Sequence, residues 1–428
     1  MPRLITTTKP SAEKALLIGI DSPYQRSPLD VEESLEELAM LLSACGAEVL
    51  AKIIVKQPKP TPATYITGGK LEEAAGLVSE LGATLVVFDI ELNQRQVGNC
   101  ERILDCGVID RPQAILDIFA LHASTAEGKI AVELAMLQYL LPHLTGKGRE
   151  LSRLGGGIGT RGPGETKLET DRRRVRERIS KLKKELAGVE KRRRQASQRR
   201  RTPGGPFRVA LVGYTNSGKT TLLNTLTASH AYTENGFFST LDPTTRRLTL
   251  ANGRQVVLSD TVGFISKLPH QLVEGFRATL EEVVVADVIL LVADASDPRL
   301  PAQLTVVQEV LEELGAEHIP QILVLNKRDK LGAEELTARL EVRAEAVAVS
   351  ALRGDNLSEL LLRIEKQAMR HIVCVRAQFD RKDVAKTKRF RRYAQVIHES
   401  NSEDGKLVIE AWMERTLAES FPGLQYIG

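Results

Sequence analysis

Gly213-Tyr-Thr-Asn-Ser-Gly-Lys-Thr220 fits the phosphate-loop pattern GxxxxGK[ST] and follows an apolar run, Phe207 to Val212, that predicts a β-strand. In such a loop, backbone N–H groups and the N-terminus of the following helix surround phosphate oxygens. Lys219 would neutralise charge on the β and γ phosphates, and Thr220 would offer its hydroxyl to Mg²⁺. The stretch therefore predicts an α/β domain that binds a nucleoside triphosphate.

A second phosphate-side motif, Asp260-Thr-Val-Gly263, follows the apolar run Val256 to Ser259. The Asp260 carboxylate could support the Mg²⁺ ion indirectly, through the groups that ligate it. The Gly263 N–H could sense the γ phosphate. This motif therefore predicts the segment that responds to the difference between a triphosphate and a diphosphate.

A candidate switch segment lies between these two motifs, Phe237-Phe-Ser-Thr-Leu-Asp-Pro-Thr-Thr245. Thr240 is our choice for the second protein hydroxyl on Mg²⁺. Spacing alone leaves Thr244 and Thr245 open as competitors. We expect Lys219, Thr240 and Gly263 to carry the catalytic roles.

The choice of base is predicted by Asn326-Lys-Arg-Asp329, at the end of another apolar strand. The Asp329 carboxylate can accept hydrogen bonds from the ring N–H and the amino group of guanine. Adenine presents a lone pair instead, and an unpaired buried carboxylate costs about 1–3 kcal/mol. Asn326 should brace the loop, and Lys327 should pack its stem on the base.

The last predicted contact is Ser350-Ala-Leu352, where the Ala351 N–H could donate to the guanine carbonyl. All four motifs occur in order, each after a predicted strand, which is where open α/β sheets bind ligands. We therefore predict a GTP site. Its residues are Gly213, Tyr214, Thr215, Asn216, Ser217, Gly218, Lys219, Thr220, Thr221, Phe238, Ser239, Thr240, Leu241, Asp242, Asp260, Thr261, Val262, Gly263, Asn326, Lys327, Arg328, Asp329, Ser350, Ala351 and Leu352.

Phe264 occupies the position where small GTPases resembling Ras place a water-positioning Gln. Because an apolar ring cannot polarise water, we expect slow turnover by the isolated chain, with a bound partner supplying or aligning the missing polar group. A protein that binds GTP without hydrolysing it is the alternative.

The rest of the chain predicts further domains, since 428 residues exceed what one core supports. Alternating strand-like and helical runs before residue 126 predict a parallel sheet. Between Arg172 and Arg201 fifteen Lys or Arg face three Glu, a local charge of +12 in a chain whose total is +4. Such a block is typical of a protein that binds a polyanion, with a solvated helix face as the alternative.

Two narrow apolar stripes, starting near Ile130 and Leu168, predict helices that pair antiparallel. A glycine-rich, basic loop at 145–164 would form the tip. We thus expect a multidomain α/β protein. Its parts would be an N-terminal parallel α/β domain (1–125), an antiparallel helical arm (126–205), a doubly wound phosphate-loop GTPase domain (206–371) and a small C-terminal α+β domain (372–428).

Much of the chain, from about residue 10 to 370, resembles HflX-type GTPases. The resemblance rests on Val108-Ile-Asp-Arg-Pro112, on Ile115-Leu-Asp-Ile-Phe119, and above all on the run from Gly155 to Glu169 followed by Asp171-Arg-Arg173. GYTNSGKTT, FSTLDPTT and DTVGF, with its Phe264, also match the family pattern. The matching positions assign the two Mg²⁺ ligands to Thr220 and Thr240.

The resemblance implies a stress-related protein that binds the large ribosomal subunit and its rRNA and uses GTP to dissociate stalled or idle ribosomes. It implies ribosome-stimulated hydrolysis, with Arg153, Arg161 and Lys167 as candidate RNA contacts. The alternatives are a ribosome-assembly or RNA-processing GTPase and a signalling switch with a protein partner.

Neither a signal-peptide core nor a run of eighteen apolar residues occurs in the sequence. We therefore expect a cytoplasmic monomer that needs no membrane, with GTP as substrate and Mg²⁺ as cofactor.

Overall fold

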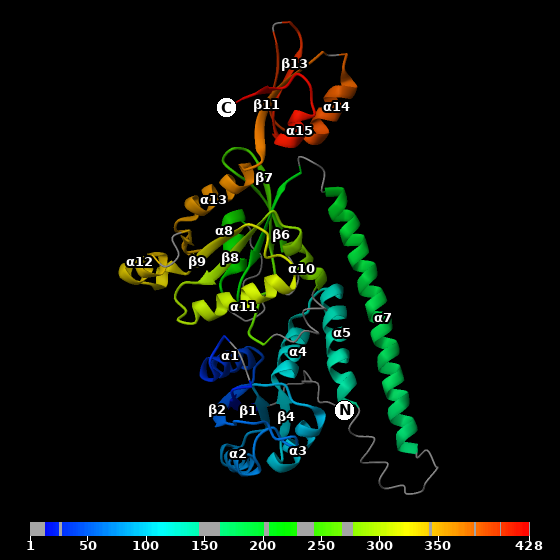
Figure 1. Cartoon of the computed structure of the whole chain (residues 1–428), viewed down its shortest axis with the longest axis vertical. Helices are drawn as coiled ribbons and strands as arrows, with labels where there is room; N and C mark the ends of the chain where they lie inside the picture. Colours follow the sequence, from blue (N-terminus) through cyan, green and yellow to red (C-terminus); the bar gives the residue numbers. More distant parts are fainter. Residues whose placement is uncertain are drawn as a thin grey trace.

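The computed structural model describes residues 13–24, 28–144, 163–200, 205–228, 244–267, 277–341, 345–380, 382–402 and 404–427. Within these residues the strands form three separate sheets. Figure 1 shows the three sheet domains one above another, with a long helix alongside the lower two. This arrangement confirms the predicted multidomain α/β fold.

The N-terminal sheet is parallel, with the strand order β2-β1-β3-β4. The chain reverses its winding direction between β1 and β3, and the residues after those strands therefore meet at a topological switch point. The strands are β1 (Lys14–Asp21), β2 (Glu48–Lys56), β3 (Leu85–Phe88) and β4 (Gly107–Asp110). The helices are α1 (Val31–Ala44), α2 (Gly68–Leu81), α3 (Gln94–Leu104) and α4 (Arg111–His122).

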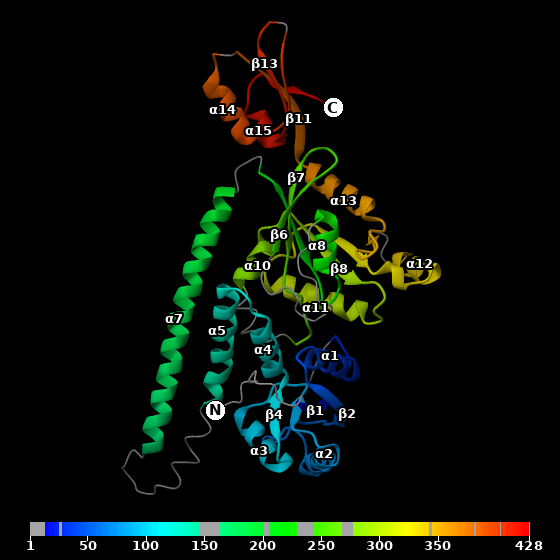
Figure 2. The same ribbon diagram turned by 180° about the vertical axis from the view of Figure 1, so that it is seen from behind.

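The helical arm consists of α5 (Ala126–His143) and α7 (Pro163–Arg200), which run antiparallel (Figures 1 and 2). Their seam is apolar, as the periodicity predicts, with Leu134, Leu182 and Leu186 buried in one cluster. Arg178 adds a bidentate pair with Glu133 across the seam, both bonds at 2.7 Å. α7 has 38 residues and α5 only 18, so much of α7 extends beyond the seam.

The GTPase-like domain has a six-stranded sheet in the order β10-β9-β8-β5-β7-β6, in which only β6 is antiparallel to its neighbour. Its strands are β5 (Phe207–Val212), β6 (Thr244–Thr249), β7 (Gln255–Asp260), β8 (Val288–Asp294), β9 (Gln321–Asn326) and β10 (Val347–Ala348). The helices are α8 (Lys219–Thr227), α10 (Arg277–Val284), α11 (Leu300–Glu313), α12 (Ala333–Glu341) and α13 (Leu357–Met369), with a 3-10 turn at Arg328–Lys330.

The C-terminal domain is an antiparallel sheet covered by helices, with Phe390 buried between Phe379 and Phe421. Trp412 donates to the Asn252 carbonyl at 3.3 Å, which joins this sheet to the turn between β6 and β7. Its elements are β11 (Ile372–Phe379), α14 (Val384–Tyr393), β12 (Gln395–Asn401), β13 (Leu407–Glu414), α15 (Arg415–Glu419) and β14 (Gln425–Tyr426).

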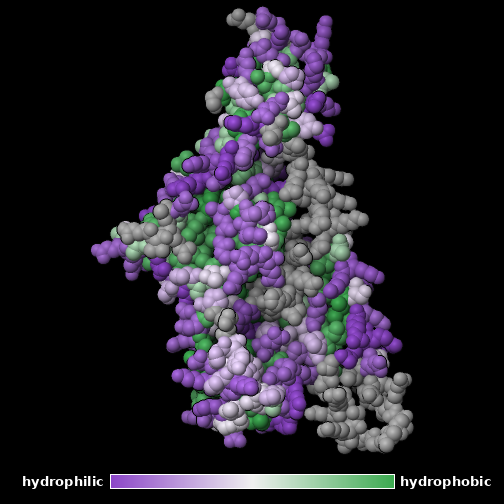
Figure 3. All heavy atoms as spheres, in the orientation of Figure 1, coloured by the Kyte–Doolittle hydropathy of each residue, from purple (hydrophilic) through white to green (hydrophobic). Residues whose placement is uncertain are grey.

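One hydrophobic cluster is shared by the N-terminal domain, the arm and the GTPase-like domain. It includes Leu41 of α1, Phe119 of α4 and Ala135 of α5, together with Tyr214 and Phe264 from the nucleotide motifs. The outer surface is mostly hydrophilic in the view of Figure 3. None of the helices in the described part of the chain has the length and apolar composition that a membrane crossing needs.

Candidate functional site

The phosphate loop joins β5 to α8 and is shaped by close backbone approaches. Gly218 has φ +90°, a left-handed conformation that favours glycine. A Cβ at this position would also lie 2.3 Å from the Asn326 side-chain nitrogen. Asn326 donates from that nitrogen to the Ser217 carbonyl at 2.8 Å, so the base-side motif holds the phosphate loop in place.

Lys219 is buried at the first turn of α8, with only 6% of its surface exposed. Its ammonium donates to the carbonyls of Gly213 and Tyr214 at 3.1 and 3.0 Å. Burial lowers its pKa from 10.5 to about 8, although the nearby Asp260 carboxylate acts in the opposite direction. Burial disfavours the charged ammonium, and a nearby anion such as a phosphate would favour it.

The second phosphate-side motif lies directly beside the first. The Thr220 hydroxyl donates to the Asp260 carboxylate at 2.6 Å, and Thr261 is tied to the Leu211 carbonyl at 2.7 Å. The pairing of β5 with β7 brings these residues together, since Leu211 and Asp260 are partners in its register. The two motifs thus present a hydroxyl and a carboxylate at one edge of the sheet.

Gly263 packs against the phosphate loop more closely than any residue with a side chain could. A Cβ there would lie 2.9 Å from the Thr215 Cα and 3.1 Å from the Lys219 ammonium nitrogen. The next residue, Phe264, donates its N–H to the Gly213 carbonyl at 3.1 Å and accepts from the Thr215 N–H at 2.8 Å. These bonds extend the β5–β7 pairing beyond both strands and hold Gly263 beside the Lys219 ammonium.

Phe264 is 1% exposed and belongs to the hydrophobic cluster shared with the N-terminal domain and the arm. The sequence showed only that a polar group is missing at this position. In the structure the ring also anchors the segment after Gly263, because its burial fixes that backbone against the phosphate loop.

On the base side, Asp329 lies in the 3-10 turn after β9. The Ser350 hydroxyl donates to its carboxylate at 2.6 Å and holds its pKa below the usual range. The carboxylate is therefore ionised at neutral pH and can accept the two N–H groups of guanine. Lys327, which precedes the turn, donates to the Asn216 carbonyl at 2.6 Å and pairs with Asp294 at 2.8 Å.

The Ala351 N–H, the predicted donor to the guanine carbonyl, donates to the Asn326 side-chain oxygen at 2.9 Å. Asn326 lies between the phosphate loop and the loop at 350–352 and bonds to both. The contact between Ala351 and guanine stays a prediction. Leu352, which is 80% exposed, is the most accessible residue of that loop.

The structure brings together the predicted residues at 213–221, 260–263, 326–329 and 350–352 at one edge of the six-stranded sheet. The other predicted positions lie outside the described residues: Phe238, Ser239, Thr240, Leu241 and Asp242 of the switch segment, and Arg153 and Arg161 of the loop. Lys167 lies in the first turns of α7. The competitors Thr244 and Thr245 are in β6, opposite Asp260 and Ser259 of β7.

Sequence reasoning assigned no site role to three charged residues of the N-terminal domain that bond to Tyr214 of the phosphate loop or to Ser266 and Lys267, just after the second phosphate-side motif. These are Glu37, Asp89 and Arg111, each about 1% exposed. Arg111 lies in the run Val108–Pro112 that carries the family resemblance, and Asp89 follows an apolar run, but neither signal reveals the partners of these residues.

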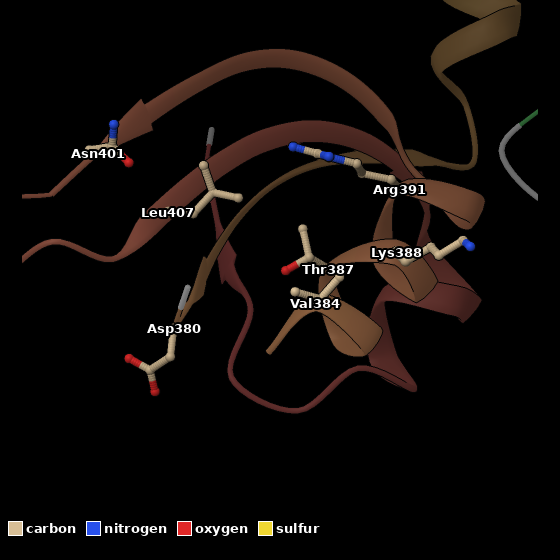
Figure 4. Close-up of a pocket in the computed structure, with 7 residues that line it drawn as sticks. All are labelled: Asp380, Val384, Thr387, Lys388, Arg391, Asn401 and Leu407. Carbon is tan, nitrogen blue, oxygen red and sulfur yellow. The ribbon is translucent and has the colours of Figure 1, made fainter. Parts of the chain in front are cut away.

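Elsewhere, an open hollow of about 600 Å³ lies between α14 and the strands of the C-terminal sheet. Figure 4 shows Lys388, Arg391 and Asp380 around it. Arg391, which lines this hollow, is paired with Glu399. Among the described residues, no three His, Cys, Asp or Glu side chains form a cluster that could hold a metal ion by themselves.

Three family models match successive parts of the chain. The model described as GTP-binding GTPase N-terminal matches residues 32–120, and GTP-binding GTPase Middle Region matches 122–200. The third, described as 50S ribosome-binding GTPase, matches residues 208–327.

Several similar proteins, matched over most of their length, are named GTPase HflX. The chain is 39% identical to GTPase HflX of Escherichia coli over 422 residues, which is 97% of each chain. It is 43% identical to GTPase HflX of Lacrimispora saccharolytica over 396 residues, 92% of each. Among solved structures, a GTP-binding protein from Sulfolobus solfataricus in complex with GDP is 28% identical, covers 84% of this chain and 99% of its own, and has a TM-score of 0.42.

Proposed function

The chain belongs to the HflX family of GTPases and hydrolyses GTP, and on this premise we propose that it acts on the large ribosomal subunit, using GTP to dissociate stalled or idle ribosomes. The observation that carries the proposal is the combination of an assembled GTP site with a separate, strongly basic helical arm. The name of the matched GTPase-domain model, a 50S ribosome-binding GTPase, points to the same partner.

The proposed chemistry at the site uses GTP with Mg²⁺. Thr220 and Asp260 offer a hydroxyl and a carboxylate oxygen within 2.6 Å of one another, and hard oxygen donors suit Mg²⁺. Thr220 would ligate the ion together with Thr240, and Asp260 would support it indirectly. When bound, the ion would neutralise negative charge on the transferring phosphoryl group. Lys219 would bind the phosphates, Gly263 would sense the γ phosphate, and Asp329 would select guanine.

RNA binding is proposed for the arm because α7 exposes cations on the side away from its seam. Arg173, Arg174, Arg176, Lys183 and Lys184 are exposed. The pairs within this helix are long, such as Arg173 with Glu177 at 3.9 Å, and they leave the cations hydrated. Exposed cations along a helix can bind the phosphate backbone of RNA, and the affinity of such binding falls as the salt concentration rises. We extend the proposal to Arg153, Arg161 and Lys167 near the tip.

The test is GTP hydrolysis with and without purified large ribosomal subunits, with Lys219→Ala as the inactive control. We expect strong stimulation by the subunits. Replacing Arg173, Arg174 and Lys184 by Ala should reduce this stimulation but leave the intrinsic rate unchanged, whereas Arg363→Ala with Lys366→Ala on α13 should change neither. Equal rates with and without subunits would refute the ribosomal proposal.

Dissociation needs its own measurement, because a ribosome-assembly GTPase could also be stimulated. Intact ribosomes incubated with the chain and a non-hydrolysable GTP analogue should separate into subunits on a sucrose gradient, and the Lys219→Ala variant should leave them intact. Binding without separation would favour the assembly role. We also propose that the protein is a cytoplasmic monomer with the four domains that the sequence predicts.

A further inference from the structure

The N-terminal domain contacts the segment that follows Gly263, and this contact lies outside the nucleotide motifs themselves. The N-terminal sheet reverses direction between β1 and β3, so its natural ligand position lies beyond the ends of those strands. In this chain Ser266 and Lys267 of the GTPase domain contact residues there. We name Glu37, Asp89 and Arg111 the charged triad, and Phe264 to Lys267 the docked segment.

Arg111 is at the centre of the charged triad. Its guanidinium pairs with Glu37 and with Asp89, and it donates to the Ser266 hydroxyl at 2.8 Å and to the Ser266 carbonyl at 3.2 Å. Burial alone would lower the pKa of Arg111, but the two carboxylates outweigh this and raise it. The guanidinium thus remains charged and its planar fork joins two elements of one domain to a backbone carbonyl of another.

Further bonds connect the triad to the phosphate loop and to the docked segment. The Tyr214 hydroxyl, from the phosphate loop, donates to Glu37 and accepts from the Ser266 N–H at 2.8 Å. The Ser266 hydroxyl also donates to Glu37. Tyr214 of the phosphate loop and Ser266 of the docked segment therefore share the buried Glu37 carboxylate.

Lys267 completes the charge balance. Its ammonium donates to the Asp89 carboxylate at 2.6 Å and to the Asp89 carbonyl at 3.0 Å. Burial raises the pKa of Asp89, but Arg111 and Lys267 outweigh it and hold that pKa below the usual range. If the docked segment left, two carboxylates would remain with one cation, and Arg111 would lose two acceptors. Departure is therefore opposed by the loss of a buried cation's partners and by an unbalanced charge beside Asp89 and Glu37.

Docking also determines where Gly263 lies. Phe264 is buried in the shared hydrophobic cluster, and its backbone bonds to Gly213 and Thr215. Gly263 is thus held against Lys219 from the side that faces the N-terminal domain. Removing one partner of a buried ion pair is costly, because it leaves an uncompensated buried charge.

We propose that Arg111 and Lys267 are positioning residues for the γ-phosphate response. Together with Glu37 and Asp89 they hold the docked segment so that Gly263 already faces Lys219 when GTP arrives. The inference rests on the proposed GTP site but not on ribosome binding. Because linkage is reciprocal, GTP would in turn tighten the contact between the N-terminal domain and the GTPase domain.

The test measures the affinities of the full chain for a non-hydrolysable GTP analogue and for GDP, without ribosomes. Lys267→Met keeps the aliphatic stem of a side chain that is 26% exposed, and Arg111→Lys keeps the charge but loses the fork. In both variants we expect the ratio of analogue affinity to GDP affinity to fall about 5- to 150-fold, the usual span of coupling between sites. Arg363→Ala, which removes an exposed pair with Glu359, should leave the ratio unchanged.

Hydrogen exchange provides a second readout in the same variants. Amides of residues 258–267 should exchange faster with GDP bound, and the analogue should restore only part of the protection. An unchanged affinity ratio in both variants would overturn the proposal. This outcome includes equal weakening of both nucleotides, which would mean that the triad supports only the fold. If the wild-type chain bound neither nucleotide, the proposed GTP site would fail as well.

Discussion

Nucleotide binding should take up a proton at Lys219 in mildly alkaline solution. Burial gives this ammonium a pKa of about 8 in the nucleotide-free chain. Phosphate oxygens favour the charged form, so the pKa of Lys219 rises on binding. Below pH 8 the group is already charged and affinity is insensitive to pH. As the pH rises through 8, the affinity falls, approaching a tenfold loss, or about 1.36 kcal/mol, per pH unit.

The measurement is isothermal titration calorimetry with a non-hydrolysable GTP analogue, in two buffers of different ionisation enthalpy at fixed Mg²⁺. With a pKa of about 8, roughly three-quarters of a proton should be taken up at pH 8.5 and about a tenth at pH 7. Lys219→Arg is the matched control, because a guanidinium remains charged throughout this range. Wild-type protein that takes up no proton at pH 8.5 would refute the assignment of a depressed pKa to Lys219.

Three further substitutions test other parts of the structure. Gly263→Ala places a Cβ 2.9 Å from the Thr215 Cα. This overpacking costs about 1–3 kcal/mol and should lower kcat/KM for GTP roughly 5- to 150-fold, with little change in GDP affinity. Normal turnover would contradict the close approach. Asp329→Ala should weaken GTP binding about 10- to 150-fold through the loss of charged hydrogen bonds, and leave ATP binding unchanged in a competition assay. Leu182→Ala, at a position 1% exposed, should destabilise the seam by about 2 kcal/mol and speed amide hydrogen exchange in α5 roughly 30-fold. Leu362→Ala, at a position 60% exposed, should have neither effect. Equal exchange rates in the two variants would argue against a stabilising seam.

The nucleotide motifs were predictable because their chemistry is local. A phosphate loop needs glycine at set positions and a lysine at the start of a helix, and these requirements fall within the eight residues of 213–220. The same is true of Asp329, whose proposed role follows from the donors on guanine. The seam of the arm was also readable, because Leu182 and Leu186 keep the spacing of one helix face.

The partners of these motifs depend on how distant segments fold together. Arg111 and Ser266 are 155 residues apart in the chain, and Glu37 and Tyr214 are 177 apart. No local periodicity connects such residues, because their contact depends on the docking of two domains that each fold around their own sheet. The sequence also identified Phe264 only as a missing glutamine. Its burial in a cluster drawn from two domains and the arm is a property of tertiary packing, and so is the position that this burial gives to Gly263.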